Sequence, residues 1–172
     1  MRIYLIGYSY AGKSTMARLL AAHLGMDSFD TDLAIEQKYH TSIPMFFKRY
    51  DENAFRIVER QMLQHTATMD NVVVATGGGT SCSDENIRFI LEHGTAIHME
   101  MTVDDILQRM SHAHKSRPTL IGKSDAELRQ FITTQLTARL PYYQQAPLSI
   151  SAMNLTPEAL ANLLREASLL SR

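Results

Sequence analysis

The chain has 172 residues, of which 45% are hydrophobic and 20% charged, and this composition predicts a single globular domain, not a disordered chain. Its formal net charge of −1 argues against a nucleic-acid partner held by bulk electrostatics, and no apolar run reaches the ~20 residues that cross a membrane. A single cysteine cannot form an internal disulfide, and the first residues lead into a strand without a secretory leader, so we expect a cytoplasmic protein.

A phosphate-binding motif stands at the start of the chain. Residues 2–6 predict a short apolar strand, residues 7–15 read GYSYAGKST and match G-x-x-x-x-G-K-[ST], and residues 14–24 predict a helix. A helix N-terminus behind a glycine-bounded loop points several backbone N–H groups at one anion. We therefore expect a nucleoside triphosphate site, with Lys13 at the β- and γ-phosphates and the Ser14 hydroxyl on Mg²⁺. A chance match in a helical turn is the alternative, and the flanking strand and helix disfavour it.

Two carboxylates follow next. Residues 27–32 predict a short extended segment that ends in Asp30 and Asp32. In an arbitrary chain these residues would be interpreted as a turn and a helix N-cap. Beside a phosphate-binding loop, we favour a functional pair at the end of a strand.

A glycine-rich loop follows the most hydrophobic strand. Residues 72–75 form a continuous β-branched and small apolar run, which predicts a strand buried on both faces. Gly77, Gly78 and Gly79 come directly after it, where the backbone must turn sharply or pass close to another group. We expect Cys82, just beyond them, to be a small buried residue.

The remaining segments alternate between helix and strand, and a polar stretch without periodicity, residues 111–123, predicts a lid loop. This alternation predicts an α/β fold, with a central parallel sheet of about five strands between two layers of helices. Ligands bind such sheets at the carboxyl ends of the strands, so we expect the motifs above to share one pocket. The further helices are predicted over residues 33–39, 43–47, 51–66, 83–91, 102–110, 124–140 and 157–170, and the further strands over residues 95–100 and 148–150.

The series of motifs resembles the shikimate kinase family along nearly the full chain. The motifs that carry the resemblance are Asp30-x-Asp32, Phe55-Arg56-x-x-Glu59, the three glycines, Arg117-Pro118 and Arg139. It implies a P-loop kinase fold related to nucleoside monophosphate kinases, in one domain over residues 1–172 with a substrate-binding segment at 31–60. It also implies an enzyme that uses ATP and Mg²⁺ to phosphorylate the 3-hydroxyl of shikimate.

On the acceptor side, the resemblance implies that Asp32 binds the ring hydroxyls and accepts the 3-hydroxyl proton. Arg56 and Arg139 would clamp the substrate carboxylate, which suits the paired donors of a guanidinium group. The three glycines would present backbone N–H groups to the ring. Taken alone, Arg56 could instead pair with acidic neighbours on a helix surface, and Arg139 lies near a helix end where a cation is favourable anyway.

On the nucleotide side, the resemblance implies that Arg117 on the lid stabilises the transferring phosphate and that Asp30 holds Mg²⁺ through water. The residues expected to bind ATP are Tyr10, Ala11, Gly12, Lys13, Ser14, Thr15, Arg109 and Arg117. Family members commonly carry glycine where this chain has Tyr10. Because a tyrosine at positive φ is disfavoured, we expect Tyr10 in an ordinary backbone region with its ring turned outward.

Two other functions stay open at this point. A related small-molecule kinase acting on a gluconate-like substrate would also present a carboxylate to two arginines. The other is a degenerate P-loop module that binds nucleotide without turnover. It is considered because Tyr10 and the segment expected near the adenine, residues 151–154, depart from the family pattern. We expect a monomer, with no nucleic-acid or membrane partner.

Overall fold

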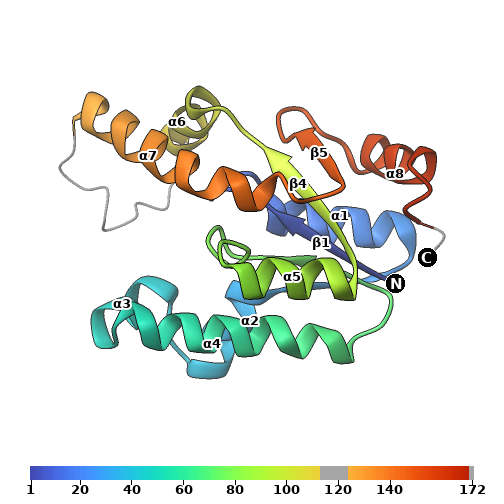
Figure 1. The fold of residues 1–172 in the computed structure, drawn as a ribbon, viewed down its shortest axis with the longest axis horizontal. Helices are drawn as coiled ribbons and strands as arrows, with labels where there is room; N and C mark the ends of the chain where they lie inside the picture. The colour runs from blue at the N-terminus through green and yellow to red at the C-terminus, as the bar shows by residue number, and fades with distance from the viewer. Residues whose placement is uncertain (113–123, 171–172) are drawn as a thin grey trace.

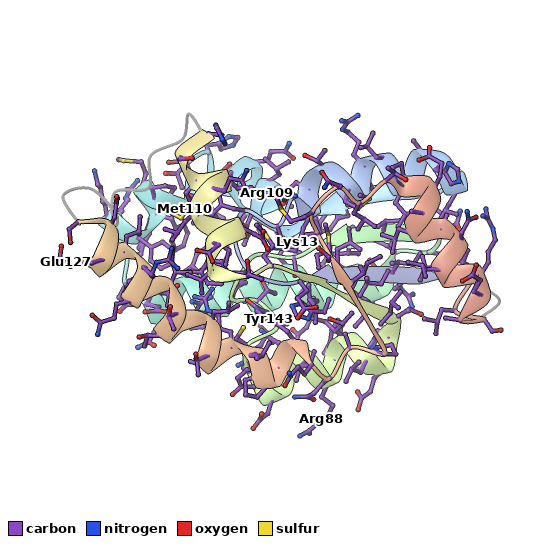
Figure 2. The ribbon with its side chains drawn as sticks, turned by 90° about the horizontal axis from the view of Figure 1, so that it is seen from above. Lys13, Arg88, Arg109, Met110, Glu127 and Tyr143 are labelled. Carbon is purple, nitrogen blue, oxygen red and sulfur yellow. The ribbon has the colours of Figure 1, made fainter. Side chains whose placement is uncertain are left out.

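The structure, a computed structural model, describes residues 1–112 and 124–170 (Figure 1). Its centre is a parallel sheet of five strands in the order β2-β3-β1-β4-β5, as the alternation of elements predicts. Helices cover both faces: α1 and α8 lie on one side of the sheet, and α5 and α7 on the other (Figures 1 and 2). The strands are β1 (Arg2–Ile6), β2 (Asp27–Asp30), β3 (Val72–Ala75), β4 (Thr95–Glu100) and β5 (Leu148–Ser151).

Several helices begin at a residue whose side chain caps the first turn. Asp51 accepts a hydrogen bond from the Ala54 backbone at 2.7 Å, and Ser124 and Glu127 form a capping box at the start of α7. The helices are α1 (Lys13–Leu24), α2 (Thr31–Tyr39), α3 (Ile43–Arg49), α4 (Glu52–His65), α5 (Asp84–His93), α6 (Val103–His112), α7 (Asp125–Tyr143) and α8 (Pro157–Glu166), with a 3₁₀ turn at Thr66–Thr68.

The lid prediction is wrong at its first two residues. Ser111 and His112 continue α6 as its last residues, because no glycine or proline interrupts the helix at this point. The rest of the predicted lid, residues 113–123 with Arg117, lies outside the described residues.

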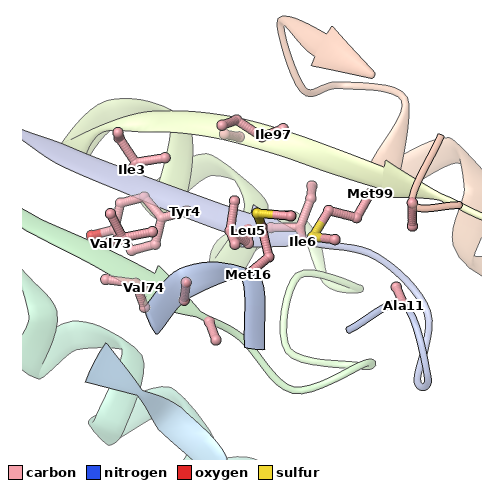
Figure 3. Packing of buried hydrophobic residues seen from close by; sticks show 14 of the residues in the cluster. Ile3, Tyr4, Leu5, Ile6, Ala11, Met16, Val73, Val74, Ile97 and Met99 are labelled. Atoms are coloured by element: carbon pink, nitrogen blue, oxygen red, sulfur yellow. The ribbon is translucent and has the colours of Figure 1, made fainter. Parts of the chain in front are cut away.

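The main core lies along the central strands. All four residues of β3 are buried, as is expected of a strand covered on both faces, and Ile3, Tyr4, Leu5 and Ile6 of β1 are each 0% exposed. Figure 3 shows side chains of β1, β3 and β4 packed against one another, with Met16 of α1 among them. A second, smaller cluster joins α2, α3 and α4 into a lobe beside β2, and its buried members are Ile35, Phe46, Phe55 and Met62.

The register of the strands determines which loops meet. Ala75 pairs with Leu5 on one side and with Asp30 on the other, while Ile6 pairs with His98. The strand ends are therefore level, and the loops that follow β1, β2 and β3 emerge at the same edge of the sheet. No helix among the described residues is long and apolar enough to cross a membrane.

Candidate active site

The loop between β1 and α1 closes around the side chain of Lys13. Lys13 is only 7% exposed, and its Nζ donates hydrogen bonds to the carbonyl oxygens of Gly7 and Tyr8, both at 2.7 Å. Gly7 has φ 138°, and a Cβ there would lie 2.6 Å from the carbonyl oxygen of Met99, so only glycine fits. Gly12 is the N-cap of α1 with φ 82°, and the first turn of the helix holds no acidic residue. The amides at this helix start are therefore suited to binding an anion.

Tyr10 is found in a different conformation from the one expected. Its φ is 69°, in the left-handed region, and its ring is half-buried against the main core instead of being turned outward. Contacts from the rest of the protein hold this conformation, because Nη1 of Arg109 donates a hydrogen bond to the carbonyl oxygen of Tyr10. Holding a tyrosine there costs about 1–2 kcal/mol relative to an unstrained backbone.

Arg109 of α6 fastens this strained turn to the rest of the protein. Its Nη1 donates to the carbonyl oxygen of Tyr10 at 2.9 Å, and its Nη2 donates to that of Ala152 at 2.6 Å. The guanidinium group thus joins α6, the P-loop (residues 7–15) and the segment after β5. Its expected place beside the adenine stays a prediction.

Asp30 and Asp32 have different surroundings: Asp30 caps α2, whereas Asp32 contacts the glycine loop (residues 77–79). Oδ1 of Asp30 accepts hydrogen bonds from the backbone N–H groups of Asp32 and Leu33, both at 3.0 Å, so Asp30 is indeed the N-cap of α2. The Asp32 carboxylate lies against this loop, since its Oδ1 is only 2.6 Å from where a Cβ on Gly77 would be. The absence of a side chain at Gly77 is what makes room for this carboxylate.

Arg56 is held in place by two glutamates. Its Nη1 donates to Oε2 of Glu59 at 2.8 Å and its Nη2 donates to Oε1 of Glu52 at 3.0 Å. Glu59 is 2% exposed and also accepts a hydrogen bond from the Thr80 hydroxyl at 2.7 Å. Burial by itself lowers the pKa of Arg56, but the charges and hydrogen bonds of Glu59 and Glu52 outweigh it and raise the pKa. The helix-surface pairing considered from the sequence therefore exists, but its Glu59 half is buried.

Arg56 and Arg139 both contact the glycine loop. A Cβ on Gly79 would lie 3.0 Å from Nη1 of Arg56, and Nη1 of Arg139 donates to the carbonyl oxygen of Gly78 at 3.3 Å. Gly78 also touches the P-loop, because a Cβ there would lie 2.6 Å from Oγ of Ser9. The structure thus brings together one carboxylate, two guanidinium groups and the phosphate-binding loop around three adjacent glycines.

Three further residues complete this arrangement, and the sequence did not assign them a role in the site. Glu59 orients Arg56, and it could have been found from its i, i+3 spacing on a helix. The Tyr8 ring lies under Arg139, with Cζ 5.3 Å from the ring centroid, and the Tyr143 hydroxyl donates to Gly78. Figure 2 shows Lys13 and Tyr143 near the centre of the molecule, with Arg88 and Glu127 at its margins.

The donor chemistry of this edge suits a magnesium ion bound together with phosphates. Among the described residues, no group of three or more His, Cys, Asp or Glu side chains could hold a metal by itself. Mg²⁺ fits such a site, since it keeps several waters and takes one or two protein oxygens plus phosphate oxygens. The Ser14 hydroxyl and the Asp30 carboxylate, whose Oδ2 takes no part in the α2 cap, offer oxygen ligands of this kind.

A parallel sheet in the order 2-3-1-4-5, with a P-loop after its central strand and a carboxylate and two arginines at the neighbouring glycine loop, is the arrangement of a P-loop kinase of small molecules. A family model described as shikimate kinase matches residues 10–168. The chain belongs to the shikimate kinase family.

Individual relatives agree with this assignment. The shikimate kinase of Parabacteroides distasonis is 35% identical over 158 residues, which are 92% of this chain and 91% of the relative. The crystal structure of shikimate kinase from Bacteroides thetaiotaomicron superposes with a TM-score of 0.88 at 34% identity, over 100% of this chain and 99% of that chain. Shikimate kinase from Acinetobacter baumannii, solved in complex with shikimate, superposes with a TM-score of 0.86 at 31% identity, over 99% and 94% of the chains.

A solved gluconokinase resembles this chain in its fold alone. A gluconokinase from Sinorhizobium meliloti superposes with a TM-score of 0.60, but it is only 16% identical over 99% of this chain and 95% of its own. At this identity the likeness shows the arrangement of strands and helices and nothing about the acceptor.

Proposed function

We propose that this protein transfers the γ-phosphate of ATP to the 3-hydroxyl of shikimate and releases shikimate 3-phosphate and ADP. The observation that carries the proposal is the meeting of Asp32, Arg56 and Arg139 on one glycine loop that itself touches the P-loop. A phosphate donor bound by the P-loop and an acid bound by the two arginines would face each other across this contact. Membership of the shikimate kinase family supports the same substrates.

The acceptor is held by its carboxylate. Arg56 and Arg139 approach the glycine loop from α4 and α7, so their guanidinium groups can clamp one carboxylate from two sides. Asp32 reaches the loop from α2, where its carboxylate would bind the ring hydroxyls and take the proton of the 3-hydroxyl as it attacks phosphorus. The backbone N–H groups of the three glycines would lie against the ring.

The donor is held by main-chain amides and by Lys13. On ATP binding, the Nζ of Lys13 would exchange its hydrogen bonds with Gly7 and Tyr8 for the β- and γ-phosphates. Ser14, and Asp30 through water, would hold Mg²⁺, which supplies charge neutralisation for the phosphates. Arg117 would stabilise the transferring phosphate, and Arg109 would lie near the adenine.

The proposal also covers the location, oligomeric state and partners of the protein. We place it in the cytoplasm as a monomer of one domain over residues 1–172, in which residues 31–60 bind the substrate. Its partners would be ATP and shikimate, without a nucleic acid or a membrane. A single cysteine and a net charge of −1 support this placement.

The direct test is an ADP-release assay on purified protein with ATP and Mg²⁺. Shikimate should stimulate ADP formation, mass spectrometry should show one added phosphate per shikimate, and gluconate should give no stimulation. ATP binding without any shikimate-dependent turnover would refute the proposal and leave a nucleotide-binding module. Turnover of gluconate in place of shikimate would refute it in favour of a different acceptor.

Asp32→Asn tests the proton acceptor while keeping the shape of the side chain. We expect kcat to fall by about 10²–10⁴-fold, the range for loss of a general base, with shikimate still bound. Asp27→Asn is the matched control, because Asp27 is an exposed carboxylate at the other end of β2. Equal activity of the two variants would remove Asp32 from the mechanism.

A further inference from the structure

Tyr143 takes no part in the reaction proposed above, yet it lies against the centre of the site. It is the last residue of α7 and is 0% exposed, and its hydroxyl donates a hydrogen bond to the carbonyl oxygen of Gly78 at 2.5 Å. Arg139, four residues earlier on α7, donates to the same oxygen at 3.3 Å. Residues four apart share a helix face, so α7 holds one carbonyl of the glycine loop with two side chains.

The ring of Tyr143 rests on the sheet beneath the P-loop. It stacks on His98 of β4 with ring centroids 5.0 Å apart and an interplanar angle of 27°. His98 is 3% exposed, and its Nδ1 lies 2.9 Å from the hydroxyl oxygen of Ser149 on β5. Across the sheet His98 pairs with Ile6, the last residue of β1 before the P-loop. The Tyr143 ring therefore packs on His98, a buried side chain of β4 that also contacts β5 through Ser149.

The contacts form a closed circuit around the site. Gly78 meets Ser9 of the P-loop, since a Cβ on Gly78 would lie 3.0 Å from the backbone nitrogen of Ser9. Gly7, at the start of that loop, meets His98, whose Cδ2 lies 3.5 Å from where a Cβ on Gly7 would be. Glycine loop, P-loop, β4 and the end of α7 thus enclose Tyr143, and a closely packed interior of this kind transmits displacements.

We propose that Tyr143 is a positioning residue, which sets the distance between the phosphate donor on the P-loop and the acceptor held by Arg139 and the glycine loop. This inference rests on the proposed function, because it assigns donor and acceptor to these two loops. Phosphate transfer is sensitive to such placement, since a misplacement of about 1 Å costs roughly 10²-fold in rate. Tyr143 acts through Gly78 and touches neither substrate.

The protonation of Tyr143 agrees with this role. Burial raises the pKa of the Tyr143 hydroxyl, and the neighbouring Cys82 raises it further. The hydroxyl therefore stays protonated at physiological pH and keeps its hydrogen for the Gly78 carbonyl.

The test is Tyr143→Phe, which keeps the stacked ring and removes the hydroxyl. We expect kcat/KM for shikimate to fall about fivefold, the effect of one lost neutral hydrogen bond, through both a lower kcat and a higher KM. The KM for ATP should change by less than about twofold, because the amides and Lys13 that bind phosphate are untouched. The matched control is Tyr142→Phe, which removes a hydroxyl one residue earlier on the same helix and should leave both constants unchanged.

A purely structural role would give a different result. Tyr143→Phe would then lower the melting temperature while kcat and both KM values stayed at wild-type levels well below that temperature, and this outcome would overturn the inference. Equal kinetics for Tyr143→Phe and Tyr142→Phe would overturn it as well. A wild-type protein without shikimate turnover would instead refute the proposed function, so the two failures are distinguishable.

A second variant, His98→Ala, tests the proposal independently. It leaves the Tyr143 hydroxyl in place and removes the surface on which the ring rests. We expect shikimate kcat/KM to fall as it does in Tyr143→Phe, and Tyr143→Phe on this background should add less than it does alone. Strictly additive losses would mean that the two residues do not act through one another, contrary to the proposal.

Discussion

The P-loop consists of nine consecutive residues, whereas the proposed acceptor side takes its groups from α2, α4, the glycine loop and α7. The P-loop is shaped mainly by backbone: Gly7 and Gly12 at positive φ, amides at a helix start, and Lys13 turned back onto two carbonyls. The acceptor side is shaped by side-chain contacts over long sequence separations, such as the bond between Arg139 and Gly78.

This difference separates general from specific recognition. Backbone amides around a phosphate suit any nucleoside triphosphate, so a P-loop by itself indicates a class of reactions. Two guanidinium groups and one carboxylate at defined positions recognise one shape of acid. Substitutions on the two sides should therefore have separable effects on ATP and on shikimate, and the following predictions test that separation.

The largest effect is expected from Lys13→Met, which keeps most of the side-chain volume and removes the charge. We expect turnover to fall by about 10³-fold, because stabilisation of the transferring phosphate is lost. Shikimate binding, measured by calorimetry, should stay within about twofold, because no acceptor group is changed. Lys38→Met removes a charge from an exposed lysine and is the control. Near-normal turnover in Lys13→Met would contradict a phosphate role for this side chain.

Arg56→Ala tests the other side of the comparison. We expect kcat/KM for shikimate to fall about 10²-fold through loss of charged hydrogen bonds, while the KM for ATP stays within about twofold. Arg60→Ala, four residues on and paired with Glu85 at 2.8 Å on the surface, should leave both constants unchanged. A rise in the KM for ATP as large as the loss for shikimate would show that the two sides are not separable.

The Arg56 side chain also carries part of the stability. Its removal leaves Glu59, 2% exposed, without its cationic partner. We expect a loss of about 2 kcal/mol in the free energy of unfolding, less than for a wholly buried pair because Arg56 is 39% exposed. Glu59→Gln on the Arg56→Ala background should recover part of this loss in urea titrations without recovering activity. No recovery would mean that the buried charge is not the cause.

A smaller effect is expected within the P-loop at Tyr10. Tyr10→Gly and Tyr10→Ala both remove the ring, but only glycine accepts φ 69° without strain. We expect the glycine variant to be more stable than the alanine variant by about 1 kcal/mol in urea unfolding, with similar ATP binding. An alanine variant of equal or greater stability would show that the loop relaxes out of the left-handed conformation.

The smallest effect concerns Cys82, which lies behind the glycine loop with Sγ 3.8 Å from the Gly78 carbonyl oxygen. Burial raises the pKa of its thiol, so less of the reactive thiolate is present at any pH below that value. Iodoacetamide should therefore alkylate the folded protein several-fold more slowly than the urea-unfolded chain at pH 8. Equal rates in the two states would mean that the thiol is not shielded.

Local sequence was sufficient wherever a structure depends on neighbouring residues. The P-loop motif, the capping residues Asp51 and Ser124, and the β-branched strand at residues 72–75 were all predicted, because their physical causes lie within a few residues. The α/β class with a parallel sheet followed from the alternation of elements. The resemblance to one family then named candidate residues on both sides of the pocket.

Tertiary structure decided what depends on distant neighbours. Glu59 orients Arg56 because Thr80 and the glycine loop close over it, and Tyr143 reaches Gly78 across 65 positions of sequence. The left-handed Tyr10 has the same origin, since Arg109, 99 positions away, holds its carbonyl. Secondary-structure propensity depends on a residue and its sequence neighbours, whereas the positions of these three side chains depend on packing between distant segments. At Tyr10 the combined contacts outweigh the cost of the left-handed backbone, about 1–2 kcal/mol.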